Sequence, residues 1–174
     1  MSLILKHASP LLVIAALLFT QQTTVPTLDK VDYDVYSAVI RSLSPNLRNS
    51  PFLIKTHTEL VAPAKLITLQ HLPEDARTDF LEKNRQSVTL QEQFSLPVAY
   101  HLTNEDKVGG YGFLVIGLSR IGFNRAKDKA LVYITYNLDT MDGQNAKERF
   151  FVVNKAGDQW VVQGTVGVIK RITE

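Results

Sequence analysis

The chain has 174 residues, of which 45% are hydrophobic and 21% are charged, and its formal net charge is +2. This composition is typical of one globular domain with an apolar core and argues against two full domains. Lysine and arginine are interspersed with acidic residues and form no basic stripe, which argues against nucleic acid as a partner. Because the chain has no cysteine, disulfides, thiolate metal sites and cysteine nucleophiles are excluded.

The N-terminal segment predicts export. Lys6 and His7 precede the uninterrupted apolar run of residues 11–19, which would cross only about half of a ~30 Å hydrocarbon core. That length is typical of a signal peptide and too short for a membrane span. We therefore expect residues 1–20 to be a signal peptide, the protein to be periplasmic or secreted, and no transmembrane span to remain after the leader is removed. An uncleaved anchor and a buried helix of a cytosolic protein are the alternatives.

Residues 21–30 are expected to form a linker, and residues 31–174 a single domain. The first element of this domain is a helix that Asp29 or Asp32 caps and that Pro45 ends, because proline forces the preceding residue out of the helical region. Its apolar side chains recur with helical spacing and draw one stripe: Val35, Tyr36, Val39, Ile40 and Leu43.

The middle of the chain alternates between extended and helical patterns. Residues 52–61 alternate as a strand does, and residues 73–84 predict a helix that starts at a proline, with acidic residues near its beginning and basic residues near its end. Residues 88–96 are consistent with a strand or an extended linker. Residues 98–102 predict a short strand.

The C-terminal third predicts an antiparallel meander. Residues 113–123, 130–138, 149–154 and 159–172 are rich in β-branched and aromatic residues, and turn residues separate them at 124–129, 139–146 and 155–158. In the last strand we expect one face to carry Trp160, Val162, Val166 and Val168. The predicted fold class is α+β, with the N-terminal helices packed on a C-terminal antiparallel sheet of about four meander strands and one or two extra strands.

Three stretches carry a resemblance. The hexapeptide Ser-Arg-Ile-Gly-Phe-Asn at residues 119–124, the strand at 130–134 and the ending Asn-Lys-Ala-Gly-Asp-Gln-Trp-Val-Val at residues 154–162 resemble a group of exported bacterial proteins of unassigned function. The resemblance covers residues 111–168 and implies a sheet, without active-site residues. The order of helices before a long-stranded sheet is also similar to cystatin-like and NTF2-like folds.

Residues near the hexapeptide are the first candidates for a site. Ser119 misses the nucleophile-elbow spacing by one position and lies in a predicted strand, so we interpret it as structural. Arg120 and Asn124 would either hold a carboxylate or fix the following hairpin through hydrogen bonds to backbone carbonyls. A second candidate is an apolar pocket, lined by Tyr133, Tyr136 and Trp160, that would bind a small apolar ligand.

Histidines and carboxylates give only partial metal sites. His57 and Glu59 are two apart on a predicted strand and would need His71 or His101 to complete a metal site. The acidic loop at residues 139–145 lacks the register of a calcium loop. No motif indicates a cofactor.

Three functional hypotheses follow. The favoured one is an exported, non-enzymatic binding or protein-interaction domain whose ligand, a protein or a small apolar molecule, is unknown. The second is an extracytoplasmic metal-dependent hydrolase. The third is an accessory component of an envelope assembly that adds an edge strand to a partner sheet. Histidines that converge in space would favour the hydrolase. A closed apolar cavity would favour the binding domain, and a long uncharged edge strand would favour the assembly component.

Overall fold

The computed structural model describes residues 26–43, 52–66, 73–104, 114–140 and 143–166. The predicted signal peptide at residues 1–20 lies outside these ranges. The described elements follow one another along the chain as α1 (Lys30–Leu43), β1 (Phe52–Lys55), the 3-10 helix η2 (Pro63–Leu66), α2 (Glu74–Lys83), β2 (Tyr100–Thr103), β3 (Leu114–Leu118), β4 (Gly122–Phe123), β5 (Lys129–Thr140), β6 (Gly143–Ala156) and β7 (Gln159–Val166).

Helix α1 starts as its sequence predicts. The Asp29 carboxylate accepts hydrogen bonds from the backbone N–H groups of Val31 (2.9 Å) and Asp32 (3.1 Å), and the Asp32 carboxylate accepts one from the N–H of Asp29 (2.9 Å). This reciprocal arrangement satisfies N–H groups that have no partner inside the helix. Both candidate caps therefore act together.

The described strands form one seven-stranded sheet with the order β2-β1-β3-β5-β6-β7, and β4 pairs with β5 beside β3. The expected antiparallel sheet is in fact mixed, because β1 runs parallel to both β2 and β3. Parallel neighbours require a long crossover connection, which here contains η2 and α2. The remaining pairs, from β3 to β7, are antiparallel as predicted.

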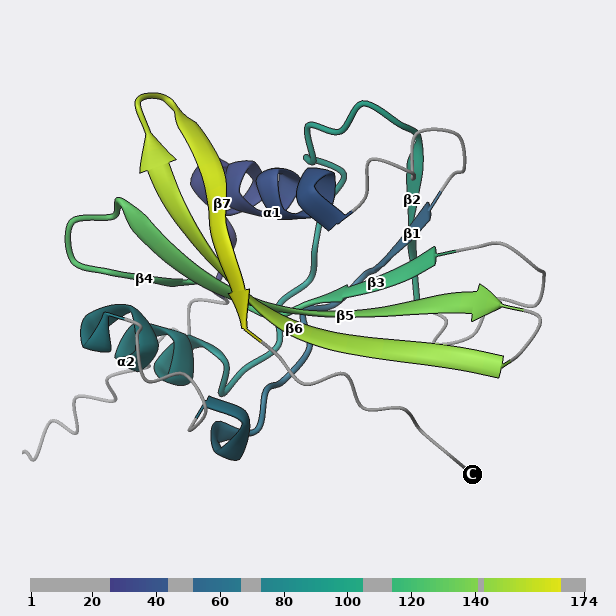
Figure 1. The fold of residues 1–174 in the computed structure, drawn as a ribbon, viewed down its shortest axis with the longest axis horizontal. Helices are drawn as coiled ribbons and strands as arrows, with labels where there is room; N and C mark the ends of the chain where they lie inside the picture. The colour runs from purple at the N-terminus through teal and green to yellow at the C-terminus, as the bar shows by residue number, and fades with distance from the viewer. Residues whose placement is uncertain (1–25, 44–51, 67–72, 105–113, 141–142, 167–174) are drawn as a thin grey trace, which may run out of the picture.

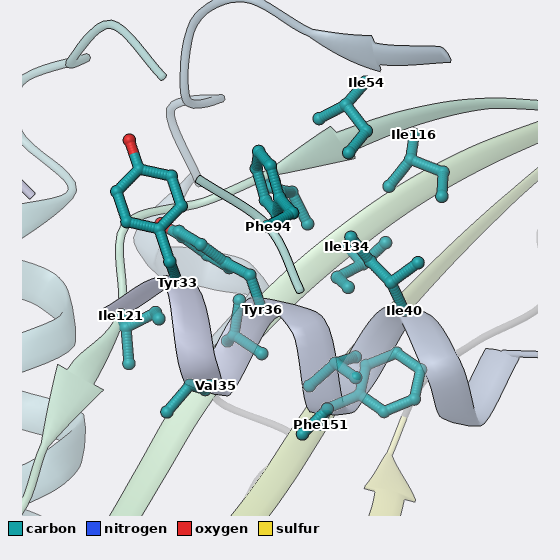
Figure 2. Close-up of a cluster of buried hydrophobic side chains, with 14 of the residues drawn as sticks. Tyr33, Val35, Tyr36, Ile40, Ile54, Phe94, Ile116, Ile121, Ile134 and Phe151 are labelled. Atoms are coloured by element: carbon teal, nitrogen blue, oxygen red, sulfur yellow. The ribbon is translucent and has the colours of Figure 1, made fainter. Parts of the chain in front are cut away.

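The two helices lie on opposite faces of the sheet and do not share one face (Figure 1). On the α1 face, Tyr36 and Ile40 pack with residues from β1, β3, β5 and β6 (Figure 2). On the other face, Phe80 of α2 and Leu66 of η2 pack with Leu131, Tyr133 and Phe150. Side chains of β5 therefore alternate between two buried clusters, so this strand is buried on both sides.

Helix α2 also closes one edge of the sheet. Its Asp79 accepts a hydrogen bond from the backbone N–H of Phe123 (2.7 Å), and Asp75 accepts one from the N–H of Arg125 (2.9 Å). Carboxylates one helical turn apart thus match the N–H groups of the last residue of β4 and of a residue in the turn that follows it. The close approach requires Gly122, because a Cβ there would collide with the Ala76 carbonyl and the backbone of Phe80.

The strand expected at residues 52–61 ends at Lys55, and two predicted boundaries in the C-terminal third are also wrong. The strand expected at residues 113–123 is split into β3 and β4, because Ser119 inserts its side chain into the ladder: its Oγ accepts the Tyr133 N–H (2.9 Å) and donates to the Arg120 carbonyl (3.0 Å). The turn expected at residues 139–146 is much shorter, since β5 extends to Thr140 and β6 starts at Gly143. Long strand pairing overrides the polar composition of this segment.

Candidate functional site at the edge strand β7

Strand β7 forms one end of the sheet, and in the described part of the chain its sole partner strand is β6 (Figure 1). Its sequence, Gln-Trp-Val-Val-Gln-Gly-Thr-Val, contains neither a charged residue nor proline. Edge strands commonly carry lysine, proline or a covering element, which prevent pairing with other chains. The α2 carboxylates play this part at β4, whereas residues 163–166 of β7 are all exposed.

A bulge divides β7 into two halves. Val153 pairs with Val162 but Val152 pairs with Gly164, which leaves Gln163 without a partner residue on β6. The extra residue reverses the alternation of faces. Trp160 and Val162 pack in the α1 cluster, whereas Val166 pairs with Phe150 of the opposite cluster. The expectation that Val166 shares the face of Trp160 is therefore wrong, and Val168 lies outside the described residues.

The direction of the backbone groups of β7 follows from the ladder. The N–H of Lys155 on β6 donates to the carbonyl of Asp128, at the β5 side, at 2.7 Å. Because backbone groups alternate along an antiparallel strand, those of Phe151 also point to β5. Thr165 pairs with Phe151 and so directs its N–H and carbonyl away from β6. These are the groups with which an added strand would form hydrogen bonds.

A groove of about 720 Å³ runs between α1 and the first half of β7. Trp160 and Val162 line it from the sheet, and Ala38 and Arg41 line it from the helix. The side chain of Trp160 is buried and packs against Phe123 in a tilted arrangement, with a ring-centre distance of 5.9 Å and an interplanar angle of 58°. A strand added beyond β7 would continue the curve of the sheet around α1 and would place alternate side chains in this groove.

The charges of the groove are partly compensated. Lys30 and Asp34 form an ion pair at 2.7 Å one helical turn apart. Arg41 is exposed and donates from Nη1 to the carbonyl of Ser95 at 2.8 Å. Among the described residues no carboxylate lies within ion-pair distance of Arg41. Asp158 lines the groove from the turn before β7.

Arg120 and Asn124 both make local structural contacts. Arg120 donates from Nη1 to the Lys83 carbonyl (3.1 Å), and its backbone N–H and carbonyl bond to the side chain of Asn84 at the end of α2 (2.9 Å each). Asn124 holds the β4–β5 hairpin, because its Oδ1 accepts the N–H groups of Asp128 (3.1 Å) and Lys129 (2.9 Å). The Nε of Arg120 is buried and meets no acceptor in the described ranges.

Arg120 also lines a pocket of about 140 Å³ between the start of α1, the end of α2 and β4. Asp29, Asp32 and Lys83 line this pocket as well. Burial raises the pKa of Asp32 to about 6, and the hydrogen bond from the Asp29 backbone opposes this rise only in part. This is the most perturbed carboxyl among the described residues.

The three aromatic candidates do not gather around one pocket. Tyr136 and Trp160 belong to the α1 cluster, whereas Tyr133 belongs to the α2 cluster on the other face. The Tyr133 hydroxyl accepts a hydrogen bond from Lys65 (2.7 Å), which also pairs with Glu148 (2.8 Å). Burial and a hydrogen bond to the Glu148 carboxylate raise the pKa of Tyr133 well above its usual value. The phenol is thus held protonated and is unsuited to act as a base.

The candidate metal ligands do not form a group of three in the described part of the chain. His57 is exposed and bridges to Thr89, His101 is exposed on β2, and His71 lies outside the described residues. Glu59 is engaged elsewhere: Lys55 donates to its Oε1 (2.7 Å) and Thr135 to its Oε2 (2.8 Å), above Gly117, where a Cβ would collide with the Glu59 carboxylate. In the described ranges no group of three or more such residues is placed to hold a metal ion.

Sequence reasoning anticipated an edge strand in general terms but missed Arg41, Ser95 and the groove. The available signal was the uncharged run at residues 159–166, which is unusual for a strand at the end of a meander. Which strand lies at the edge depends on pairing that the run itself does not encode.

Within the described ranges no helix combines the length and the apolar character that crossing a membrane requires. Comparisons of the chain with protein-family models, with curated proteins and with solved structures find no significant match.

Proposed function

We propose that this protein is an exported, non-enzymatic interaction domain that binds an extended segment of a partner protein by adding it as a strand to β7. The observation that carries this proposal is the uncharged edge of β7 beside the α1 groove. Backbone hydrogen bonds would supply affinity, and side chains in the groove would supply selectivity.

The contrast between the edge at β4 and the edge at β7 supports the proposal. The backbone N–H groups of Phe123 and Arg125 beside β4 are bonded to Asp79 and Asp75 of α2. The β7 edge directs the N–H and carbonyl of Thr165 outward, with no charged side chain on the strand to repel another chain. A chain that blocks its β4 edge and leaves its β7 edge unguarded fits a binding role for β7.

The same edge favours a second candidate, an accessory component of an envelope assembly in which the added strand belongs to another component's sheet. The hydrolase hypothesis has less support, because His57, Glu59 and His101 do not gather and Glu59 is bonded to Lys55 and Thr135. A small apolar ligand is also less favoured, since charged side chains line the groove and the pocket beside Asp32.

The test compares Thr165→Pro with Thr165→Ala. Proline removes one outward N–H that β6 does not use, whereas alanine keeps it. Peptides selected from a displayed random library on the wild-type protein serve as probes, and their dissociation constants are measured by titration. We expect the proline variant to remain folded by circular dichroism and to bind at least about tenfold more weakly, with the alanine variant close to wild type. Equal binding by folded proline and alanine variants would exclude strand addition at β7.

A further inference from the structure

If β7 accepts an added strand, the two faces of that edge specify the strand's side chains. Resting on the proposed function, we infer that the partner segment alternates, with apolar β-branched residues on one face and at least one acidic residue on the other, opposite Arg41.

The face of β7 opposite α1 is apolar and accessible. Val161 and Val166 pair with Asn154 and Phe150, which places both valines on this face, and they are 49% and 40% exposed. Between them, a Cβ at Gly164 would meet no atom within 4 Å. Helix α2 contacts β4 and β5 and so covers another part of this face. Apolar, β-branched cross-strand neighbours are therefore favoured here.

On the α1 side of β7 the groove carries a cation, Arg41, which the helix contributes, whereas β7 itself contributes the apolar side chains of Trp160 and Val162. Lys30 is neutralised by Asp34, whereas Arg41 meets a carbonyl oxygen and, within the described residues, no carboxylate. Asp158 lies in the turn before β7, so it faces only one end of an added strand. A carboxylate on the added strand would give Arg41 the charged acceptor that it lacks.

Strand geometry joins the two faces into one pattern. Successive side chains of an added strand point alternately to the valine face and to the α1 groove. A segment that satisfies both surfaces therefore reads as alternating apolar and polar residues, with the acidic residue in the polar set. A basic residue at the same place would meet Arg41 and be disfavoured.

The probes are two capped peptides of about the length of β7, one alternating Val with Glu and the other alternating Val with Lys. We expect the full chain to bind the Glu peptide about two- to fivefold more tightly than the Lys peptide, the range for an exposed ion pair. Arg41→Glu should reverse this order and Arg41→Gln should abolish the preference. Arg85→Glu makes the same charge change at an exposed site after α2 and should leave the preference intact.

A second pair of peptides separates the two levels of the proposal. Both are versions of the Glu peptide in which every second backbone amide carries an N-methyl group. One peptide is methylated at the odd-numbered amides and the other at the even-numbered amides. In an added strand one of these sets of amides faces β7. The peptide methylated at that set should lose binding, whereas the peptide methylated at the other set should retain it. If both methylated peptides bind equally, strand addition itself is wrong. If only one methylated peptide loses binding, strand addition stands. The acidic partner is then overturned if the Glu and Lys peptides bind equally tightly, or if Arg41→Glu does not make the Lys peptide the tighter binder.

Discussion

Asp32 accepts a hydrogen bond at the start of α1 and also lines the pocket between α1, α2 and β4. Its carboxylate is buried enough to raise its pKa although Lys83 lies nearby. On β7, Trp160 fills the space between the strand and α1. Single side chains therefore join elements that are far apart in sequence, and their energetics can be tested one residue at a time.

Asp32→Asn is expected to stabilise the protein at high pH and not at low pH. A folded-state pKa of about 6, above the ordinary 3.8, means that the folded protein binds the proton more tightly than the unfolded chain. The stability from this group is present below about pH 4 and is lost as pH rises through about 6. Asparagine keeps an acceptor for the Asp29 N–H, so at pH 8 we expect a gain of about 1 kcal/mol, allowing for residual solvent.

Urea unfolding of wild type and Asp32→Asn at about pH 4 and pH 8 measures this effect. Asp34→Asn is the control, because Asp34 lies on the same helix and pairs with Lys30 in a more exposed position. A difference between wild type and Asp32→Asn that is the same at both pH values would contradict the prediction.

Trp160→Ala is expected to lower the free energy of unfolding by about 3–5 kcal/mol, because the indole is 7% exposed and its removal leaves a cavity beside Phe123. Val161→Ala, on the exposed face of the same strand, should cost less than about 1 kcal/mol. Both values come from denaturant unfolding. A change near zero for Trp160→Ala would mean that the indole contributes no core packing and acts only at the groove.

At the scale of elements, α2 and β4 meet at backbone distance. This approach depends on Gly122 as much as on the hydrogen bonds to Asp75 and Asp79, because the Ala76 carbonyl and the Phe80 backbone occupy the space of a side chain there. The short strand β4 therefore owes its place to the helix that covers its edge.

Gly122→Ala is expected to destabilise the protein by about 1–3 kcal/mol or more, since the atoms that a methyl group would meet belong to backbone and cannot rotate away. Gly164→Ala makes the same chemical change in β7, where the space is open, and should be within about 0.5 kcal/mol of wild type. Thermal or denaturant unfolding of both variants gives the comparison. Equal stabilities would show that α2 moves away from β4 without cost.

At the scale of the whole molecule, the mixed sheet places α1 against one face and α2 with η2 against the other, and leaves β7 as an end strand (Figure 1). The partner of such an edge depends on the compartment that the protein enters. The apolar run at residues 11–19 predicts export, so an envelope or secreted partner is expected.

Export is tested by intact-mass measurement of the native protein from cell fractions. We expect the envelope or secreted fraction to contain a chain that lacks roughly its first twenty residues, in the length range of signal peptides. A variant with Leu17→Arg and Leu18→Arg interrupts the apolar run and should remain full-length in the cytosol. Full-length wild-type protein in the cytosol would contradict the export hypothesis.

The sequence by itself determined the local elements. Asp29 and Asp32 define the start of α1, Pro73 and the acids after it define α2, and β-branched residues define β3, β5 and β7. These features depend on neighbours within a few residues, so periodicity and capping identify them.

The tertiary structure alone decided the parallel place of β1 between β2 and β3, the insertion of Ser119 and the bulge at Gln163. It also decided which candidate residues meet: Tyr133 lies on the face opposite Tyr136, and Arg41 lies beside Trp160. The physical reason is that strand order and register depend on hydrogen bonds and packing between segments distant in sequence, while the pattern of one strand describes only its own two faces.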